Sequence, residues 1–279
     1  MFLFVRRLPG LAALVTIGAC YALAEPNMTP DYEVKLLLNH TAVLGSDQKL
    51  TSAVLSTFSM PSTVTKMNVQ FLDTDDEEIY NAGWSPRIRK TEGESKFELT
   101  YKKRYAVTGG NIDAALTEAK NGGFDASDDN YDAQIEWGYQ KQTLSISRKK
   151  SASSSGYSGM DLPDKHDSRD MLIDDAPGKF DDWLSSGWGT DTLESSRIFG
   201  PVLAKRSIGM WSDLELYVEV WPIRNAVGTG IEYVVEASFK TASRTTASSK
   251  QESLIAFLQS KGWFLEQDSL KTQLIMERY

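Results

Sequence analysis

Acidic side chains recur at strand spacing in three segments of this 279-residue chain. Because successive side chains of a strand point to opposite faces, acids two or four residues apart lie on the same face of a sheet. Glutamate is depleted in strands, and like charges that face each other destabilise an exposed sheet. These acids are therefore predicted to share a bound divalent cation. The candidate metal ligands are Asp31, Glu33, Glu219, Glu232 and Glu236.

Basic side chains gather mainly in the middle of the chain, where alternation again places several of them on one strand face. Arg and Lys bind phosphate oxygens, and Arg often does so through two parallel hydrogen bonds. The candidate anion-binding residues are Arg87, Arg89, Lys90, Lys102, Arg104, Lys205 and Lys240. Lys35, Arg89 and Lys102 are the candidate catalytic residues, since a positioned cation stabilises the charge that develops on a phosphate leaving group.

Two arrangements of a sheet suit these charged faces. An ordinary antiparallel sheet turns one polar face to bulk water. A closed sheet would instead enclose the charges around water, a metal and an anion, because an unpaired buried charge is prohibitively unfavourable. The recurrence of glutamate favours the enclosed arrangement, and the solvated face remains the alternative for any single strand.

The elements that would position these residues are short strands with a few helices between them. The fold class predicted is mainly β (α+β), an eight-stranded antiparallel barrel or tunnel with a few flanking helices. Residues 25–279 form a single domain, with insertions near 106–130 and 151–189. Strands are expected over residues 32–38, 63–74, 86–91, 96–105, 131–149 as one strand or a pair, 196–208 as two short strands, 214–221, 231–240 and 269–278. Helices are expected over 46–58, 112–120 and 251–260, and a loop over 241–250.

The first 24 residues have the pattern of a cleaved export signal. Arg6 and Arg7 precede an apolar stretch, and Ala22-Leu-Ala24 is a small-residue cleavage site. The chain is therefore expected to be secreted, without a stable membrane span. Cys20, the only cysteine, would be a lipid anchor if the segment were instead a lipoprotein signal.

Composition excludes several classes of protein and leaves the oligomeric state open. The formal net charge of −8 argues against a protein that coats nucleic acid. Two histidines are too few for a metal site built on histidine, so a metal would be held by carboxylate oxygens, which suit Mg²⁺, Mn²⁺ or Ca²⁺. The expected partner is a phosphorylated small-molecule anion.

The order of several motifs resembles that of the CYTH superfamily, the triphosphate tunnel metalloenzymes, over most of residues 31–240. Asp31-x-Glu33-x-Lys35 is similar to the E-x-E-x-K motif that opens the superfamily's domain, with Asp in place of the first Glu. The further matches are Phe71-Leu-Asp73-Thr74 to an aromatic-x-Asp-Thr strand, Arg87-Ile-Arg89 to an R-x-R strand, Phe97-Glu-Leu-Thr-Tyr-Lys102 to an L-T-x-K strand, and Glu232-x-x-x-Glu236 with Lys240 to the late Glu-bearing strands.

The resemblance implies an eight-stranded antiparallel tunnel that binds triphosphate-type substrates with Mg²⁺ or Mn²⁺. Activities of the superfamily are hydrolysis of inorganic triphosphate, thiamine triphosphate or RNA 5′-triphosphate, and adenylate cyclisation. The long insertions and the export signal depart from the pattern. The alternative function is a catalytically inactive secreted protein that binds carbohydrate or protein on a β-barrel, with exposed tryptophans as a ligand platform.

Overall fold

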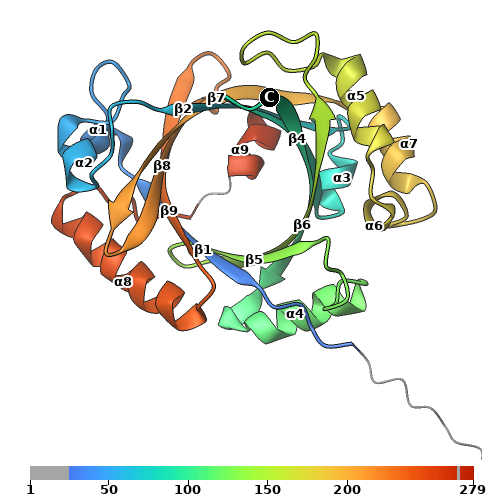
Figure 1. Cartoon of the computed structure of the whole chain (residues 1–279), viewed down its shortest axis with the longest axis horizontal. Coiled ribbons are helices and arrows are strands. Elements are labelled where there is room, and N and C mark those ends of the chain that lie inside the picture. Colours follow the sequence, from blue (N-terminus) through green and yellow to red (C-terminus); the bar gives the residue numbers. More distant parts are fainter. Residues whose placement is uncertain (1–24, 269–270) are drawn as a thin grey trace, which may run out of the picture.

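The computed structural model describes residues 25–268 and 271–279, and the predicted signal segment lies outside these ranges. Within them, nine strands form one closed barrel (Figure 1). In barrel order the strands are β1 (Asp31–Leu38), β5 (Asp132–Trp137), β6 (Gln142–Ser153), β4 (Lys96–Val107), β3 (Trp84–Thr91), β2 (Thr65–Asp73), β7 (Arg197–Trp211), β8 (Leu214–Arg224) and β9 (Ile231–Thr241).

The prediction of a mainly β barrel is confirmed, but the prediction of eight antiparallel strands is wrong. The ninth strand arises because residues 131–149 fold as a hairpin, in which β5 inserts between β6 and β1 and pairs in parallel with β1. The hairpin turn begins at Gly138, and the Asp268 carboxylate accepts hydrogen bonds from the backbone N–H groups of Tyr139, Gln140 and Lys141. A distant residue therefore stabilises the turn that separates the two strands.

Other element boundaries also differ from the sequence prediction. Residues 197–211 form one strand, β7, in place of two short ones. The loop expected over 241–250 is the first half of helix α8 (Arg244–Ser260), which Ser243 caps and which buries Ala247, Gln251, Leu254 and Leu258 along one face. The strand expected over 269–278 is helix α9 (Lys271–Arg278), because an eight-residue stretch with Thr272, Ile275 and Met276 buried fits helical spacing.

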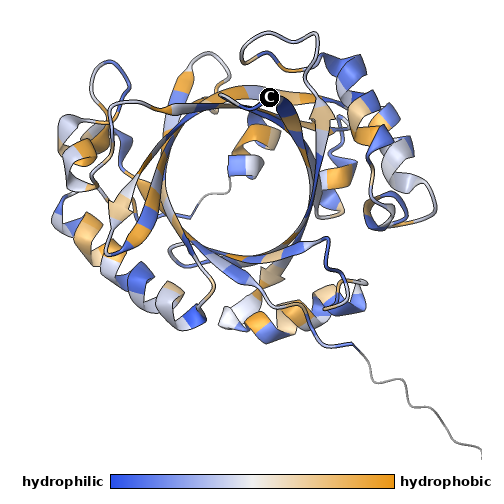
Figure 2. Cartoon of the chain, in the orientation of Figure 1, coloured by the Kyte–Doolittle hydropathy of each residue, from blue (hydrophilic) through white to orange (hydrophobic). Residues whose placement is uncertain are grey.

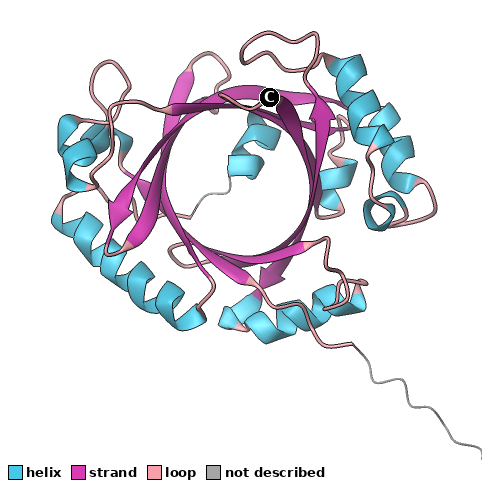
Figure 3. Cartoon of the chain, in the orientation of Figure 1, coloured by secondary structure: helices cyan, strands magenta, loops and turns pink. Residues whose placement is uncertain are grey.

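The helices surround the outside of the barrel, and α9 alone among those described lies within the ring of strands (Figure 3). The external helices are α1 (His40–Val43), α2 (Ser52–Thr57), α3 (Glu78–Asn81), α4 (Ile112–Asn121), α5 (Lys165–Asp174), α6 (Gly178–Asp181), α7 (Trp188–Glu194) and α8. The insertion over 106–130 contains α4, and the insertion over 151–189 contains α5 and α6. No helix among the described residues is long and apolar enough to cross a membrane.

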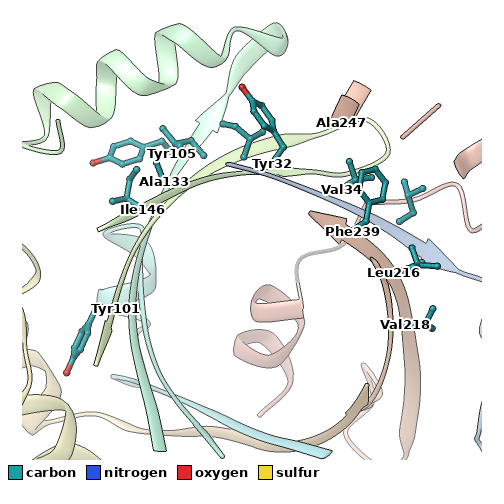
Figure 4. Close-up of a cluster of buried hydrophobic side chains, with 14 of the residues drawn as sticks. Tyr32, Val34, Tyr101, Tyr105, Ala133, Ile146, Leu216, Val218, Phe239 and Ala247 are labelled. Carbon is teal, nitrogen blue, oxygen red and sulfur yellow. The ribbon is translucent and has the colours of Figure 1, made fainter. Parts of the chain in front are cut away.

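The larger hydrophobic core lies outside the barrel wall, between the strands and the helices. Figure 4 shows its side chains, such as Tyr101, Ile146 and Phe239, pointing away from the lumen. Hydrophobic and hydrophilic residues alternate along the wall strands (Figure 2), as expected when the two faces of a strand meet different surroundings. Most strands thus pack an apolar face outward and turn charged side chains to the interior.

A second, smaller apolar cluster lies inside the barrel at the end that α9 closes. Met67, Val69 and Phe71 of β2 pack there with Ile275 and Met276 of α9. Because α9 buries its apolar side chains against this part of the wall, it is held in the barrel by hydrophobic contact as well as by charge.

Candidate functional site

Side chains from all nine strands and from α9 line a cavity of about 290 Å³ inside the barrel, here called the tunnel, and every strand except β2 contributes at least one charged side chain. Nine of the lining side chains are basic and six are acidic, so the described wall carries a formal surplus of three positive charges. The whole chain, in contrast, has a net charge of −8. The interior is therefore an electropositive compartment of an acidic protein, which suits an anionic ligand.

Two arginines of β3 face one carboxylate of β4. Arg87 Nη2 lies 2.9 Å from Glu98 Oε1, and Arg89 Nη2 lies 2.7 Å from Glu98 Oε2. Arg104, farther along β4, donates from Nη1 to Ser85 Oγ at 2.7 Å. Burial, together with the neighbouring Arg89, lowers the pKa of Arg87 to about 10. One carboxylate between two arginines leaves local positive charge unbalanced.

The Nε atoms of these three arginines share a further property. Each is buried and has no hydrogen-bond partner among the described residues. An ionised guanidinium is a strong donor whose planar geometry matches the oxygens of carboxylate and phosphate groups. Arg87, Arg89 and Arg104 are thus incompletely satisfied by the protein itself.

Beside the arginines, Glu136 of β5 lies between two lysines. Its carboxylate is 2.7 Å from Lys102 Nζ and 3.4 Å from Lys35 Nζ. Burial alone would raise the pKa of Glu136, but Lys102 and Lys35 hold it well below its ordinary value. Burial lowers the pKa of Lys102 to about 8 against the opposing effect of Glu136. The pKa of Lys35 is instead raised, because Glu136 and Glu33 together outweigh its burial.

At the closed end, the ammonium of Lys271 in α9 bridges two carboxylates of adjacent strands. Glu219 of β8 and Glu236 of β9 are paired in register, and Lys271 Nζ lies 2.6 Å from the first and 2.7 Å from the second. Arg206 of β7 lies 2.6 Å from the other oxygen of Glu219. Burial raises the pKa of Glu236, while Lys271 and Arg206 lower that of Glu219 against the effect of its burial.

The described residues contain no group of three or more His, Cys, Asp or Glu side chains placed to hold a metal ion. Mg²⁺ nevertheless uses only one or two carboxylates when substrate phosphates and water complete its coordination. Glu219 and Glu236 form such a pair, and the Lys271 ammonium shows that a cation fits between them. The donor set is therefore compatible with a metal that arrives together with a phosphate ligand.

The structure brings most of the predicted site residues into the tunnel. The members that line it are Glu33, Lys35, Arg87, Arg89, Lys102, Arg104, Glu219, Glu236 and Lys240. These include the three candidate catalytic residues, Lys35, Arg89 and Lys102. Their strands position them as alternation predicts, with the apolar neighbours of each turned to the outer core.

Four predicted residues do not line the tunnel, which corrects their assignment. Lys90 donates to the Glu94 carbonyl and the Ser154 hydroxyl on the outer face, because it directly follows the inward-facing Arg89. Lys205 precedes the inward-facing Arg206 and is turned away in the same manner. Asp31 and Glu232 are exposed near the strand ends, and Glu232 pairs with Arg278 of α9.

Six charged tunnel residues were not predicted as site residues. Five of them lie on strands with the same period of two as the predicted residues, so alternation alone carries a signal for them: Glu98, Asp132, Glu136, Lys149 and Arg206. Lys271 has no such signal, because its segment was expected to be a strand and the helix reaches Glu219 across 52 residues of sequence.

No family model matches the sequence, and no curated protein matches it. Solved structures do match. A putative adenylyl cyclase from Hippeastrum with a dominant triphosphatase activity is 14% identical, with a TM-score of 0.46 over 88% of this chain and 99% of that chain. A putative adenylate cyclase from Bacillus halodurans is 12% identical, with a TM-score of 0.48 over 90% and 98%.

A putative adenylate cyclase from Vibrio parahaemolyticus is 11% identical, with a TM-score of 0.43 over 88% of this chain and 98% of that chain. Likeness at this level assigns no activity to the chain, so the function has to be argued from the tunnel.

Proposed function

We propose that the tunnel binds a triphosphate-type anion with a divalent metal and hydrolyses one of its phosphoanhydride bonds. The observation that carries the proposal is the set of buried Nε atoms of Arg87, Arg89 and Arg104, which have no partner among the described residues. A buried polar group left without a partner costs about 1–3 kcal/mol. Three such donors on one cavity wall favour a ligand with many acceptor oxygens.

The distribution of charge favours several phosphate groups over one. The unpaired guanidinium atoms and the lysines Lys35 and Lys102 come from β1, β3 and β4, around much of the tunnel wall. A single carboxylate or sulfate would neutralise only part of that wall. A chain of phosphate groups carries several negative charges in a row, which matches the surplus of three positive charges.

The same residues have defined roles in the proposed reaction. Arg87 and Arg104 bind nonbridging phosphate oxygens and fix the position of the chain. Arg89, Lys35 and Lys102 stabilise the negative charge that develops on the leaving phosphate. Glu136 positions the two lysine ammonium groups, to which it is already bound. Lys102, with a pKa of about 8, can also give up its proton near neutral pH.

Mg²⁺ or Mn²⁺ is the proposed cofactor, with Glu219 and Glu236 as its protein ligands and Glu33 nearer the open end. When bound, the ion would neutralise phosphate oxygens and orient a water molecule. Lys271 would have to leave the two carboxylates or share them, and Arg206 would keep Glu219 in place through its own ion pair.

Release of inorganic phosphate from tripolyphosphate and ATP, with and without Mn²⁺, tests this function. The proposal expects metal-dependent release and a rise in melting temperature when tripolyphosphate is added. If tripolyphosphate is neither hydrolysed nor stabilises the protein, the inactive binding protein is the better account. The seven tryptophans do not favour that account, since each is buried or half-buried in the structure and none forms an exposed platform.

We also propose that residues 1–24 direct export and are removed. The basis is the sequence pattern alone, because this segment lies outside the described residues. Mass spectrometry of the protein secreted by its host should find Glu25 at the N-terminus. A lipid-modified Cys20, or a full-length chain retained inside the cell, would contradict cleavage after Ala24.

A further inference from the structure

Two segments of the chain match the Asn-x-Ser/Thr acceptor sequence of N-linked glycosylation, in which x is any residue except proline. They are Asn27-Met-Thr29 and Asn39-His-Thr41. Neither segment lines the tunnel. Because a match of three residues often arises by chance, the test of each is whether the asparagine amide is free to carry a glycan in the folded protein.

The side chain of Asn39 is oriented by its own acceptor sequence. Asn39 Oδ1 accepts hydrogen bonds from the Thr41 hydroxyl at 2.8 Å and from the Thr41 backbone N–H at 3.2 Å. A backbone N–H can only donate, so the accepting atom must be the amide oxygen, which fixes the direction of Nδ2. Within residues 25–268 and 271–279, Nδ2 has no hydrogen-bond partner and is not one of the buried unpartnered atoms. The amide nitrogen is therefore open to solvent.

The surroundings of Asn39 leave room for a glycan. The side chains of His40 and Thr41 are exposed, and so are the two residues that precede Trp263. The Asn39 backbone N–H donates to the Trp263 carbonyl at 2.8 Å, which holds the turn against the end of α8. Helix α1, which begins with His40, lies outside the barrel (Figure 1). A glycan on Nδ2 can thus extend into solvent without displacing a hydrogen bond of the described protein.

The amide of Asn27 is already used by the fold. Asn27 Nδ2 donates to Thr117 Oγ1 of α4 at 3.2 Å. The backbone of Asn27 also forms an isolated antiparallel bridge with Asp125. Both partners belong to the insertion over 106–130. A glycan on this nitrogen would have to lie against α4, where it would disturb the contacts that hold the start of the described chain.

We propose that Asn39, rather than Asn27, accepts an N-linked glycan during export. In the transfer, Nδ2 forms a bond to the anomeric carbon of a lipid-linked oligosaccharide diphosphate. The bond between that carbon and the phosphate oxygen breaks, the lipid diphosphate leaves, and Nδ2 gives up one proton. The turn that presents Nδ2 spans only three residues, so it can form before the barrel closes. The inference rests on the proposed export and is independent of the chemistry of the tunnel.

The test is secretion from cultured eukaryotic cells that attach N-linked glycans. One form is the whole chain, and a second is residues 25–279 behind a signal peptide of proven function, so that failure of the native signal is seen separately. Peptide N-glycosidase removes the glycan and converts the linked asparagine to aspartate, which mass spectrometry locates.

The variants are His40→Pro, its matched control His40→Ala, and Asn27→Gln. Proline at the middle position abolishes the acceptor sequence. The fold should tolerate this proline, because His40 is the first residue of α1 and Asn39 before it is extended, with φ of −65° and ψ of 102°. Melting temperatures of the deglycosylated proteins check that each variant is folded.

Wild type, His40→Ala and Asn27→Gln should all carry a glycan on Asn39, and His40→Pro should carry none. Secreted wild-type protein with an unmodified Asn39 would overturn the proposal, whatever the variants show. A glycan on Asn27 would contradict the choice between the two asparagines. If only the form with the added signal peptide is secreted, the proposed export by residues 1–24 fails, and that form still decides the state of Asn39.

Discussion

Lys102 and Lys103 are consecutive residues of β4 on opposite faces of the barrel wall, and burial lowers the pKa of each to about 8. Their surroundings nevertheless differ. Lys102 Nζ lies in the tunnel, 2.7 Å from a Glu136 oxygen. Lys103 Nζ lies in the outer core, where it donates to the Ala82 carbonyl and stands 4.3 Å from the centre of the Trp183 ring.

The comparison separates what stabilises the fold from what could bind a ligand. On the outer face, one backbone carbonyl and an aromatic ring contact the Lys103 ammonium group. On the inner face, positive charges exceed negative ones, and several donors lack partners within residues 25–268 and 271–279. Buried polar atoms without a partner among the described residues also occur on the outer face, at Trp84 Nε1 and Tyr105 Oη. The inner face differs because its unpartnered atoms belong to charged arginines in a compartment with surplus positive charge, which favours an anion.

The largest effect on stability is expected from Trp84→Ala on the outer face. Trp84 is fully buried and packs against Phe180 and Trp183. Its removal should lower the free energy of unfolding by about 3–5 kcal/mol, as for other buried aromatic residues. Urea unfolding measures this loss, and saturating tripolyphosphate should stabilise wild type and variant equally. An unchanged unfolding midpoint would mean that the outer core does not hold the barrel.

Glu136→Gln should destabilise the ligand-free protein by about 3 kcal/mol, because it leaves the ammonium group of Lys102 buried without its partner and leaves Lys35 with Glu33 alone. The same change removes negative charge from the tunnel, so tripolyphosphate should bind more tightly and restore much of the stability. Urea unfolding with and without tripolyphosphate measures both effects. Glu92→Gln, which removes an exposed pair with Lys66, is the control and should alter neither. Weaker anion binding by Glu136→Gln would contradict the assignment.

Arg89→Ala should lower the affinity for tripolyphosphate about tenfold to hundredfold, the equivalent of roughly 1.5–3 kcal/mol for a charge-assisted contact. Its stability without ligand should be unchanged or higher, because Arg87 loses a like-charged neighbour. The matched control is Arg148→Ala on β6, whose guanidinium bonds to the Asn130 carbonyl outside the tunnel. Calorimetry that finds equal affinity in wild type and Arg89→Ala would remove this arginine from the site.

The smallest effect is expected from pH. Tripolyphosphate affinity should fall several-fold, on the order of the loss of one charge contact, as pH rises through about 8 and Lys102 loses its proton. The Lys102→Met variant should show a flatter profile, whereas Lys103→Met should keep the wild-type profile. Because the same ligand is used with all three proteins, titration of the phosphate itself affects every pH profile alike and cancels when the profiles are compared. Identical profiles for all three proteins would show that Lys102 does not contact the anion.

Stability without ligand should change with pH in the opposite direction. The pKa of Lys102 and of Lys103 is about 8 in the folded protein and 10.5 in its ordinary state. Between these values the unfolded chain binds more protons, so the free energy of unfolding should rise with pH over about 8 to 10.5. Urea unfolding of wild type and Lys102→Met at pH 8 and pH 10 measures the contribution of Lys102 to the free energy of unfolding. A contribution that falls as the pH rises would contradict the prediction.

Strand alternation predicted the inner face of the barrel well, because the face on which a side chain lies is a local property of a strand. Glu33, Arg87 and Lys102 were identified in this way. Alternation does not fix the depth along the barrel, which is why Asp31 and Glu232 were included although they lie near strand ends. Lys90 was included against the alternation itself, since its neighbour Arg89 already faces inward.

The remaining features depend on contacts between distant parts of the chain. The parallel pairing of β5 with β1 adds the ninth strand, and no local sequence pattern predicts this pairing. Lys271 reaches Glu219 and Glu236 only because α9 enters the barrel, and an eight-residue segment is too short for its period to separate helix from strand.

The central claim is that the inner face, and not the outer one, binds phosphate. A crystal structure of the protein with tripolyphosphate and Mg²⁺ tests this claim most directly. The account predicts phosphate oxygens within about 2.7–3.2 Å of the Nε atoms of Arg87, Arg89 or Arg104, the range of a hydrogen bond. Phosphate bound only outside the barrel, with these three atoms still unpartnered, would contradict it.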